Sequence, residues 1–210
     1  MTRIVFMVAI ALFSSSAMAS KARMQALAQD ENGSAYIEDT RMIFLNPALL
    51  ARQGDFANFE MGSSTVPSTP NAEGGMFREL GAVKMGIQLG RESNAATRIG
   101  IIETAMGFAL SEPHNTFEAI VAGGGDMKWG ASLLYGSTEN NAEIVPPATA
   151  AYPNDKASTL ELRGGLSKDN WHGYAHLDLM SRSESETAAG ATDKYEGKPS
   201  LRLGGAFNLA

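Results

Sequence analysis

The chain has 210 residues, of which 44% are hydrophobic and 19% charged, with a formal net charge of −6 and no cysteine. This length suits one domain, and the lack of cysteine excludes disulfides and cysteine metal sites. The acidic balance argues against a nucleic-acid partner, which needs a basic surface. Glycine, at 22 residues, exceeds its usual share of about 7%.

The first 19 residues have the pattern of a secretory signal peptide. Arg3 precedes the uninterrupted apolar run 4–13, and Ala17-Met18-Ala19 supplies an A-x-A cleavage site. The run is far shorter than the roughly 20 residues that a membrane-spanning helix needs. We therefore expect export and a mature chain that begins at Ser20. No lipoprotein anchor is expected, because no cysteine follows the cleavage site.

Residues 20–54 are predicted to form a segment that precedes the main domain. Asn46 can cap a helix, Pro47 suits a first helical position, and residues 48–51 are good helix formers. A short helix is therefore expected here. A capped surface helix of any exported protein would give the same local pattern.

Residues 55–210 are predicted to form the main domain, in which apolar and polar side chains alternate over short segments. Because successive side chains of a strand point to opposite faces, each such segment has one apolar and one polar face. The pattern is clearest within 117–180. Eight strands are predicted, at residues 55–62, 80–91, 98–110, 117–123, 128–138, 159–167, 171–180 and 201–209. Residues 98–110 are ambiguous, since a helical turn or an inward-folded loop also fits them.

Short turns and long polar loops alternate between these segments. The short turns are predicted at 91–97, 123–126 and 168–170, and the long loops at 63–75, 139–157 and 181–199. This layout is typical of an antiparallel transmembrane β-barrel, with periplasmic turns and extracellular loops. Phe117, Trp129, Tyr135 and Trp171 lie near segment ends, where such barrels carry aromatic girdles. A soluble periplasmic β-sandwich, with its apolar faces packed together, is the alternative.

Two sets of segments carry a resemblance to known proteins. Residues 39–51, with Asn46-Pro47-Ala48 inside them, resemble the signature near the N-terminus of FadL-type outer-membrane barrels. That resemblance implies a plug inside or beneath the barrel. The segments 22–27, 55–60 and 127–133 resemble outer-membrane proteins of Bdellovibrio-type predatory bacteria, whose chains run on past this length. The resemblance implies the first part of a larger barrel, and a barrel of about eight strands is the other option.

The candidate site is the polar face of the predicted strands. The residues expected to line a lumen are Lys84, Gln88, Glu161, Arg163, His172, His176, Asp178 and Arg202. Mixed charges there would tune which solutes pass a pore, or would form salt bridges that fill a narrow barrel. His172 and His176 are about 13 Å apart in a strand and cannot share one metal ion, and His176 with Asp178 supplies only two ligands.

The expected function is porin-like or FadL-like passive passage of small solutes across the outer membrane of a Gram-negative bacterium. The alternative is a non-conducting structural or surface-interaction barrel that acts through its extracellular loops. No enzyme activity, metal or cofactor is expected, because no spacing singles out a nucleophile beside His114 or another histidine. The expected partners are outer-membrane lipid, the insertion machinery and small solutes, and a homo-oligomer stays open.

Overall fold

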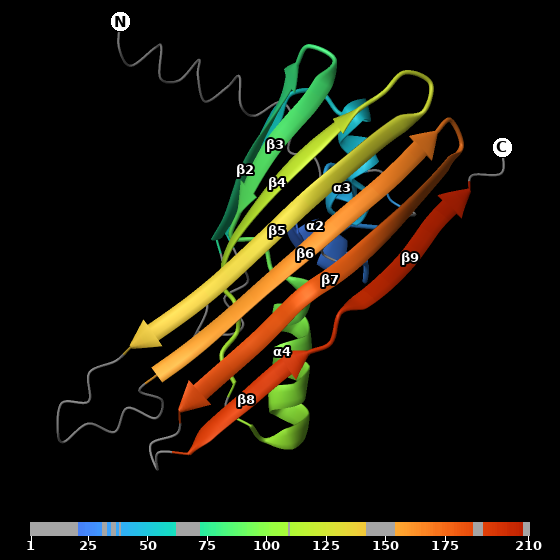
Figure 1. Ribbon diagram of the computed structural model, residues 1–210. Helices are drawn as coiled ribbons and strands as arrows, with labels where there is room; N and C mark the ends of the chain where they lie inside the picture. The colour runs from blue at the N-terminus through green and yellow to red at the C-terminus, as the bar shows by residue number, and fades with distance from the viewer. Residues whose placement is uncertain are drawn as a thin grey trace, which may run out of the picture. The chain divides into compact units, whose positions relative to one another are not determined.

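The computed structural model describes residues 21–30, 33–34, 37, 39–61, 72–108, 110–141, 154–186 and 191–207 (Figure 1). The predicted signal peptide, residues 1–19, lies outside these ranges. The chain divides into two compact units, Met1–Leu45 and Asn46–Ala210. Within the described ranges, no helix has the length and apolar character needed to cross a membrane.

The first unit contains two short helices, α2 (Lys21–Ala26) and α3 (Met42–Leu45). The turn before α3 is held by Asp39, whose carboxylate accepts a hydrogen bond from the Arg41 amide at 2.8 Å. The Arg41 guanidinium lies 5.3 Å from the centre of the Phe44 ring, a cation–π contact. These contacts are local, so they define the entry to α3.

The second unit is an antiparallel meander of nine strands with two helical segments. Its elements are η2 (Pro47–Arg52), β1 (Phe56–Met61), β2 (Ala72–Leu80), β3 (Val83–Leu89), α4 (Asn94–Met106), β4 (Asn115–Gly123), β5 (Lys128–Asn141), β6 (Asn154–Lys168), β7 (Trp171–Glu186), β8 (Thr192–Gly197) and β9 (Ser200–Phe207). Strands β1 to β8 pair in sequence order. β8 and β9 pair with successive stretches of β7, so they share one position and the sheet has eight positions. Among the described residues nothing pairs β1 with β8 or β9, and the sheet is open.

The register sorts side chains onto two faces of opposite character. One row that crosses the whole sheet consists of Ala57, Met76, Ile87, Ala119, Leu133, Leu162, Leu177 and Leu201. The neighbouring row, on the other face, consists of Gln88, Glu118, Leu134, Glu161, Asp178 and Ser200. We call the first the apolar face and the second the polar face. The large side chains of the apolar face are mostly exposed, whereas the polar face is mostly buried.

The two ends of the sheet differ in their connections. The turns at 81–82, 124–127 and 169–170 all lie at one end, which we call the short-turn end. Positive φ angles at Gly81, Gly124 and Asp169 make these turns tight. The opposite, long-connection end is where the strands lead into 62–71, 90–114, 142–153 and 187–191. The predicted alternation of short and long connections is therefore present.

Two expectations about the first strands are wrong. Of the predicted strand 80–91, residues 83–89 form β3, whereas the chain turns at Gly81-Ala82 and Leu80 belongs to the preceding strand. Residues 72–75, within the predicted loop 63–75, are also part of that strand, β2. Residues 91–97 were predicted as a short turn at the same end of the sheet as the turns 123–126 and 168–170, and this is wrong. They begin the long connection that contains α4. The paired strands of 117–138 and 159–180 are confirmed, and β5, β6 and β7 extend farther into the predicted loops.

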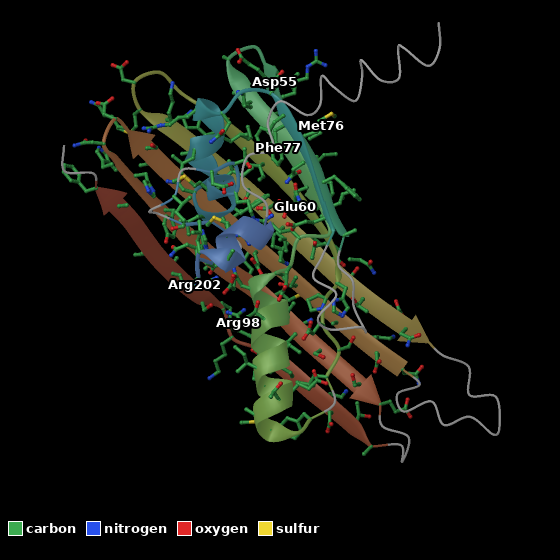
Figure 2. The ribbon with its side chains drawn as sticks, turned by 180° about the vertical axis from the view of Figure 1, so that it is seen from behind. Asp55, Glu60, Met76, Phe77, Arg98 and Arg202 are labelled. Atoms are coloured by element: carbon green, nitrogen blue, oxygen red, sulfur yellow. The ribbon has the colours of Figure 1, made fainter. Side chains whose placement is uncertain are left out.

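The predicted strand at 98–110 is also wrong, because residues 94–106 form α4. The Ser93 side chain caps its first turn by accepting from the Ala96 amide at 3.0 Å. Gly107 ends the helix in the left-handed conformation, with φ of 70°. Figure 2 shows α4 lying across the face of the strands that is turned toward the viewer.

Candidate functional site

The polar face brings all eight predicted lumen residues onto one side of the sheet. The register places Lys84, Gln88, Glu161, Arg163, His172, His176, Asp178 and Arg202 there. Six of them are buried, whereas His172 is partly exposed and Arg202, at the β9 edge, is exposed. These residues share a face because side chains alternate along each strand. Most of them are buried because α4 and η2 pack on that face.

A chain of four ion-paired side chains crosses the middle of the polar face. Arg91 Nε lies 2.6 Å from Glu118, and the other Glu118 oxygen lies 2.9 Å from Arg163. Arg163 also contacts Glu161 at 2.6 Å. All four side chains are at most 2% exposed. Buried charges carry a large desolvation penalty, so the arrangement is stable only while each charge keeps its partner.

The same carboxylates anchor α4 to the sheet. Asn94 Nδ2 donates to Glu161 at 3.0 Å, and the Ala95 amide donates to its other oxygen at 3.4 Å. The Glu161 carboxylate thus lies at the positive end of the helix dipole. One turn later Arg98 Nη1 contacts Asp178 at 2.6 Å, and Ser200 Oγ donates to the same oxygen at 2.9 Å. Helix α4 is therefore fixed by β6 and β7.

The Asn46-Pro47-Ala48 motif docks on the polar face through the Asn46 amide. Its Nδ2 donates to the Leu166 and Gly173 carbonyls, both at 3.2 Å, and its Oδ1 accepts from the Ala48 amide at 3.0 Å. One side chain thus caps η2 and joins it to β6 and β7. A Cβ on Gly165 would overlap the Asn46 amide, and a Cβ on Gly130 would overlap the backbone of η2.

The far end of η2 is held at the short-turn end of the sheet. Lys84 Nζ donates to the Gln53 carbonyl. Arg52 Nη1 donates to the Asp169 carbonyl at 3.4 Å. The predicted short helix is therefore present as a 3₁₀ turn over 47–52, and it covers the polar face of the central strands.

The histidines of β7 form an aromatic row with Tyr174. Tyr174 lies between His172 and His176, with ring centres 6.5 and 5.0 Å apart. No group of three or more potential metal ligands occurs within the described part of the chain. The row fills space beside Gly204, where a Cβ would overlap the Tyr174 ring.

Four residues of this site are not among the predicted lumen residues, namely Arg91, Asn94, Arg98 and Glu118. Glu118 had a usable signal, because it is the one charged residue within the strand 117–123. The places of Arg91, Asn94 and Arg98 in the site can be predicted only when α4 is recognised. Ser93 and Gly107 are the capping signals for that helix.

On the apolar face, the exposed apolar side chains form a belt with polar margins. The row that contains Phe117 and Tyr135 also contains Leu160 and Met180, toward the long-connection end. Trp129, and Trp171 paired with Phe207, lie toward the short-turn end. Trp171 and Met180 are about nine residues apart, or roughly 30 Å at ~3.3 Å per residue.

Beyond this belt the same face carries charged pairs at the long-connection end, which we call the charged ladder. Its pairs are Lys156–Glu139, Arg182–Glu196 and Lys194–Glu184, at 3.4, 2.9 and 3.0 Å. All six side chains are at least half exposed, so each pair contributes at most about 1 kcal/mol. The apolar face thus changes from aliphatic to charged over two rows.

A half-buried carboxyl group lies against α4 in the long connection. Glu112 occupies the space beside Gly100, where a Cβ would be 2.6 Å from its carboxylate oxygen. Burial, and then the charges of Glu92 and Glu103, raise the pKa of Glu112 to about 7. Nearby, burial lowers the pKa of His114. The packing of α4 therefore includes a carboxyl group that titrates near neutrality.

Comparison with protein families, with curated proteins and with solved structures gave no match to this chain.

The buried ion-paired chain should dominate stability on the polar face. Glu118→Gln leaves two buried guanidinium groups short of a carboxylate, so we expect the free energy of unfolding to fall by about 3–5 kcal/mol. Glu139→Gln, in an exposed pair, should cost less than about 1 kcal/mol. Urea unfolding in detergent or lipid measures both. Equal effects of the two substitutions would contradict the importance of the buried chain.

Docking of η2 should depend on Gly165 and on the amide donors of Asn46. Gly165→Ala should displace Asn46, and Asn46→Asp should keep the cap but set a carboxylate against two carbonyl oxygens. Both should speed trypsin cleavage after Arg52, with a loss of about 1–3 kcal/mol of docking energy. Gly164→Ala is the matched control, since its Cβ would meet only an oxygen at 3.9 Å. Cleavage at the wild-type rate in all three would refute the docking contacts.

Stability should fall as pH rises through 7 because of Glu112. Its folded-state pKa of about 7 lies above the ordinary value of 4.5, so folding favours the protonated form. The stabilisation is complete below about pH 4.5 and is lost as pH rises through 7. Glu112→Gln should flatten this dependence, as measured by melting temperature between pH 5 and pH 8. An unchanged pH profile in that variant would assign the dependence to other groups.

Proposed function

We propose that this chain forms the wall of an outer-membrane β-barrel, with its apolar face in lipid and its polar face toward a filled interior. The observation that carries the proposal is the inverted distribution of side chains. In a soluble sandwich the apolar faces pack against each other. Here Leu133 and Leu162 are exposed while Glu118, Glu161 and Arg163 are buried, which is the pattern of a sheet whose outer solvent is lipid.

The dimensions of the belt support a membrane location. About 30 Å along strands tilted by roughly 40° corresponds to a height of about 23 Å, close to the ~25 Å apolar band of outer-membrane barrels. Aromatic side chains lie near both margins of the belt, as such barrels require. The charged ladder then begins where the strands would leave the lipid. Export to the outer membrane also agrees with the signal pattern of residues 1–19.

Of the two expected functions, the geometry better supports a sealed structural or surface-interaction barrel. The ion-paired chain, α4 and η2 occupy the polar face at the level of the belt. Steady passage of solutes needs a water-filled path past these groups. The long-connection end, with the charged ladder, is then the surface that meets partners.

Passive passage of small polar solutes is the second candidate, and unpartnered polar atoms favour it. Both amide atoms of Gln88 and the hydroxyls of Ser167 and Ser181 are buried without a hydrogen-bond partner among the described residues. Buried polar groups are normally satisfied by protein or water. A hydrated strip along the polar face would satisfy them and would admit small solutes.

Depth-dependent quenching of tryptophan fluorescence tests the membrane proposal. Trp129 and Trp171 are the two tryptophans of the chain, and both lie on the apolar face near one margin of the belt. In vesicles of brominated lipids, bromines placed near the headgroups should quench more strongly than bromines at the bilayer centre. Trp129→Phe isolates Trp171 and should keep this order. Fluorescence unaffected by either lipid would refute a membrane-embedded sheet.

The same protein in planar bilayers separates the two functions. A sealed barrel formed by the unaltered chain should show no steady conductance. The double variant Asn94→Ala, Arg98→Ala removes side-chain contacts of α4 with Glu161 and Asp178, so it should conduct ions. Steady conductance of the unaltered chain would instead favour passive passage.

A further inference from the structure

A shallow groove of about 460 Å³ lies over the charged ladder, on the apolar face of β5 to β8. Figure 1 shows this face, because Figure 2, turned by 180°, has α4 and the polar face toward the viewer. The groove lies at the lower-left ends of β5, β6 and β7 in Figure 1. Its volume falls within the range of small-molecule sites, roughly 300–1,000 Å³. There is thus room for a small ligand at the end of the sheet that the proposed function assigns to partners.

Short side chains form the floor of the groove, between two taller walls. Ser137 of β5 lies directly opposite Ser158 of β6, and both line the groove. Tyr135, at the margin of the belt and 47% exposed, is one wall. The pair of Glu139 and Lys156, two residues beyond the serines, is the other. From Tyr135 to Glu139 the strand rises about 13 Å at ~3.3 Å per residue, so the floor is wide enough for a ligand to lie between the walls.

Hydrogen-bond donors and acceptors alternate along the second wall. In the register, the row across β5 to β8 consists of Glu139, Lys156, Glu184 and Lys194. Neighbouring strands are ~4.8 Å apart, so carboxylates and ammonium groups follow one another at about that spacing. These side chains are at least half exposed. Exposed pairs contribute little free energy, so each group can exchange its partner for a ligand at small cost.

The charges of the groove favour a neutral ligand over an ion. The charged ladder has three cationic and three anionic side chains, so its net charge is zero. A phosphate group would approach three carboxylates, and a metal cation would approach two lysines and an arginine. A hydroxyl group both donates and accepts, so a ligand with several adjacent hydroxyls can bond both kinds of side chain. Tyr135 adds an exposed aromatic ring on which an apolar C–H surface can pack.

We infer that this groove binds a neutral saccharide, whose hydroxyls bond the charged ladder and whose C–H face packs on Tyr135. The inference rests on the proposed surface-interaction function, for which it names the class of partner. Under the proposed membrane location the groove lies just beyond the lipid belt. The saccharide is then either the headgroup of a glycolipid in the same membrane or a soluble glycan.

Saccharide titration of the full chain in phosphatidylcholine vesicles tests the site. The soluble probes are neutral di- to tetrasaccharides, measured by calorimetry. The membrane probe is digalactosyl diacylglycerol, measured by native mass spectrometry as enrichment over phosphatidylcholine. Tyr135→Ala should lower the affinity several-fold, whereas Tyr135→Phe, which keeps the ring, should not. Ser158→Phe fills the floor and should abolish binding, and Ala131→Phe, which adds the same ring to the apolar face outside the groove, is the matched control.

The two probes distinguish the sources of the saccharide. Binding of a soluble probe assigns the site to free glycans, and enrichment of the glycolipid alone assigns it to a headgroup. Binding of neither refutes the site, as does binding that Ser158→Phe and Ala131→Phe affect equally. Competition by inorganic phosphate would show an anion site and would also refute the inference. Equal urea midpoints for the variants establish that each is folded.

Tryptophan quenching on the same vesicles separates this inference from the membrane proposal. Quenching without saccharide binding removes the saccharide site alone. Binding of a soluble saccharide without quenching removes the membrane wall alone. Absence of both removes the two together.

Discussion

The buried chain of Arg91, Glu118, Arg163 and Glu161 is the constraint on which the rest of this structure depends. It requires two strands, β4 and β6, and the connection before α4 to meet at fixed positions, because a displaced partner leaves a charge buried without compensation. Glu161 also receives the first turn of α4, so the placement of the helix follows from the same carboxylate. A sheet whose buried face is charged cannot rely on hydrophobic packing for register, and these ion pairs replace it.

The apolar face, in contrast, imposes few constraints on the position of individual residues. Its aliphatic rows determine little beyond which face is apolar. Under the proposed membrane location, apolar side chains there are interchangeable, since lipid has no shape to match. Specificity therefore resides on the polar face, in the ion pairs and in the close approach of Asn46 and η2 to Gly165 and Gly130. Gly130 and Gly165 are explained by this approach, which larger side chains would prevent.

The sequence predicted the parts of the fold that follow from local alternation and missed those that depend on distant contacts. Strands 128–138 and 159–180, and the shared face of the eight candidate lumen residues, follow from a period of two. The turn at Gly81-Ala82 was hidden because apolar side chains alternate on both sides of it. Residues 98–110 are ambiguous in sequence, because the β-branched Ile99, Ile101 and Ile102 suit a strand while a helical turn also fits the segment. The helix forms because Ser93 and Gly107 cap it and because Glu161 and Asp178, far along the chain, bind its first two turns. The position of the Asn46 docking contacts could not be predicted, since Gly130 and Gly165 are adjacent to η2 only after the sheet has formed.

A β-bulge in β7 divides the sheet into two parts whose sequences are constrained differently. Leu160 pairs with Met180 while Glu161 pairs with Asp178, so Leu179 is an extra residue in the strand, and the break between β8 and β9 falls at the same level. On the short-turn side of this level, the proposed membrane location restricts each outward side chain to apolar chemistry. On the other side, in the charged ladder, exposed pairs contribute little energy, so substitutions there are nearly neutral for folding. Under the proposed membrane location, the long-connection end is thus free to diversify in sequence, whereas the segment nearer the short-turn end stays chemically fixed.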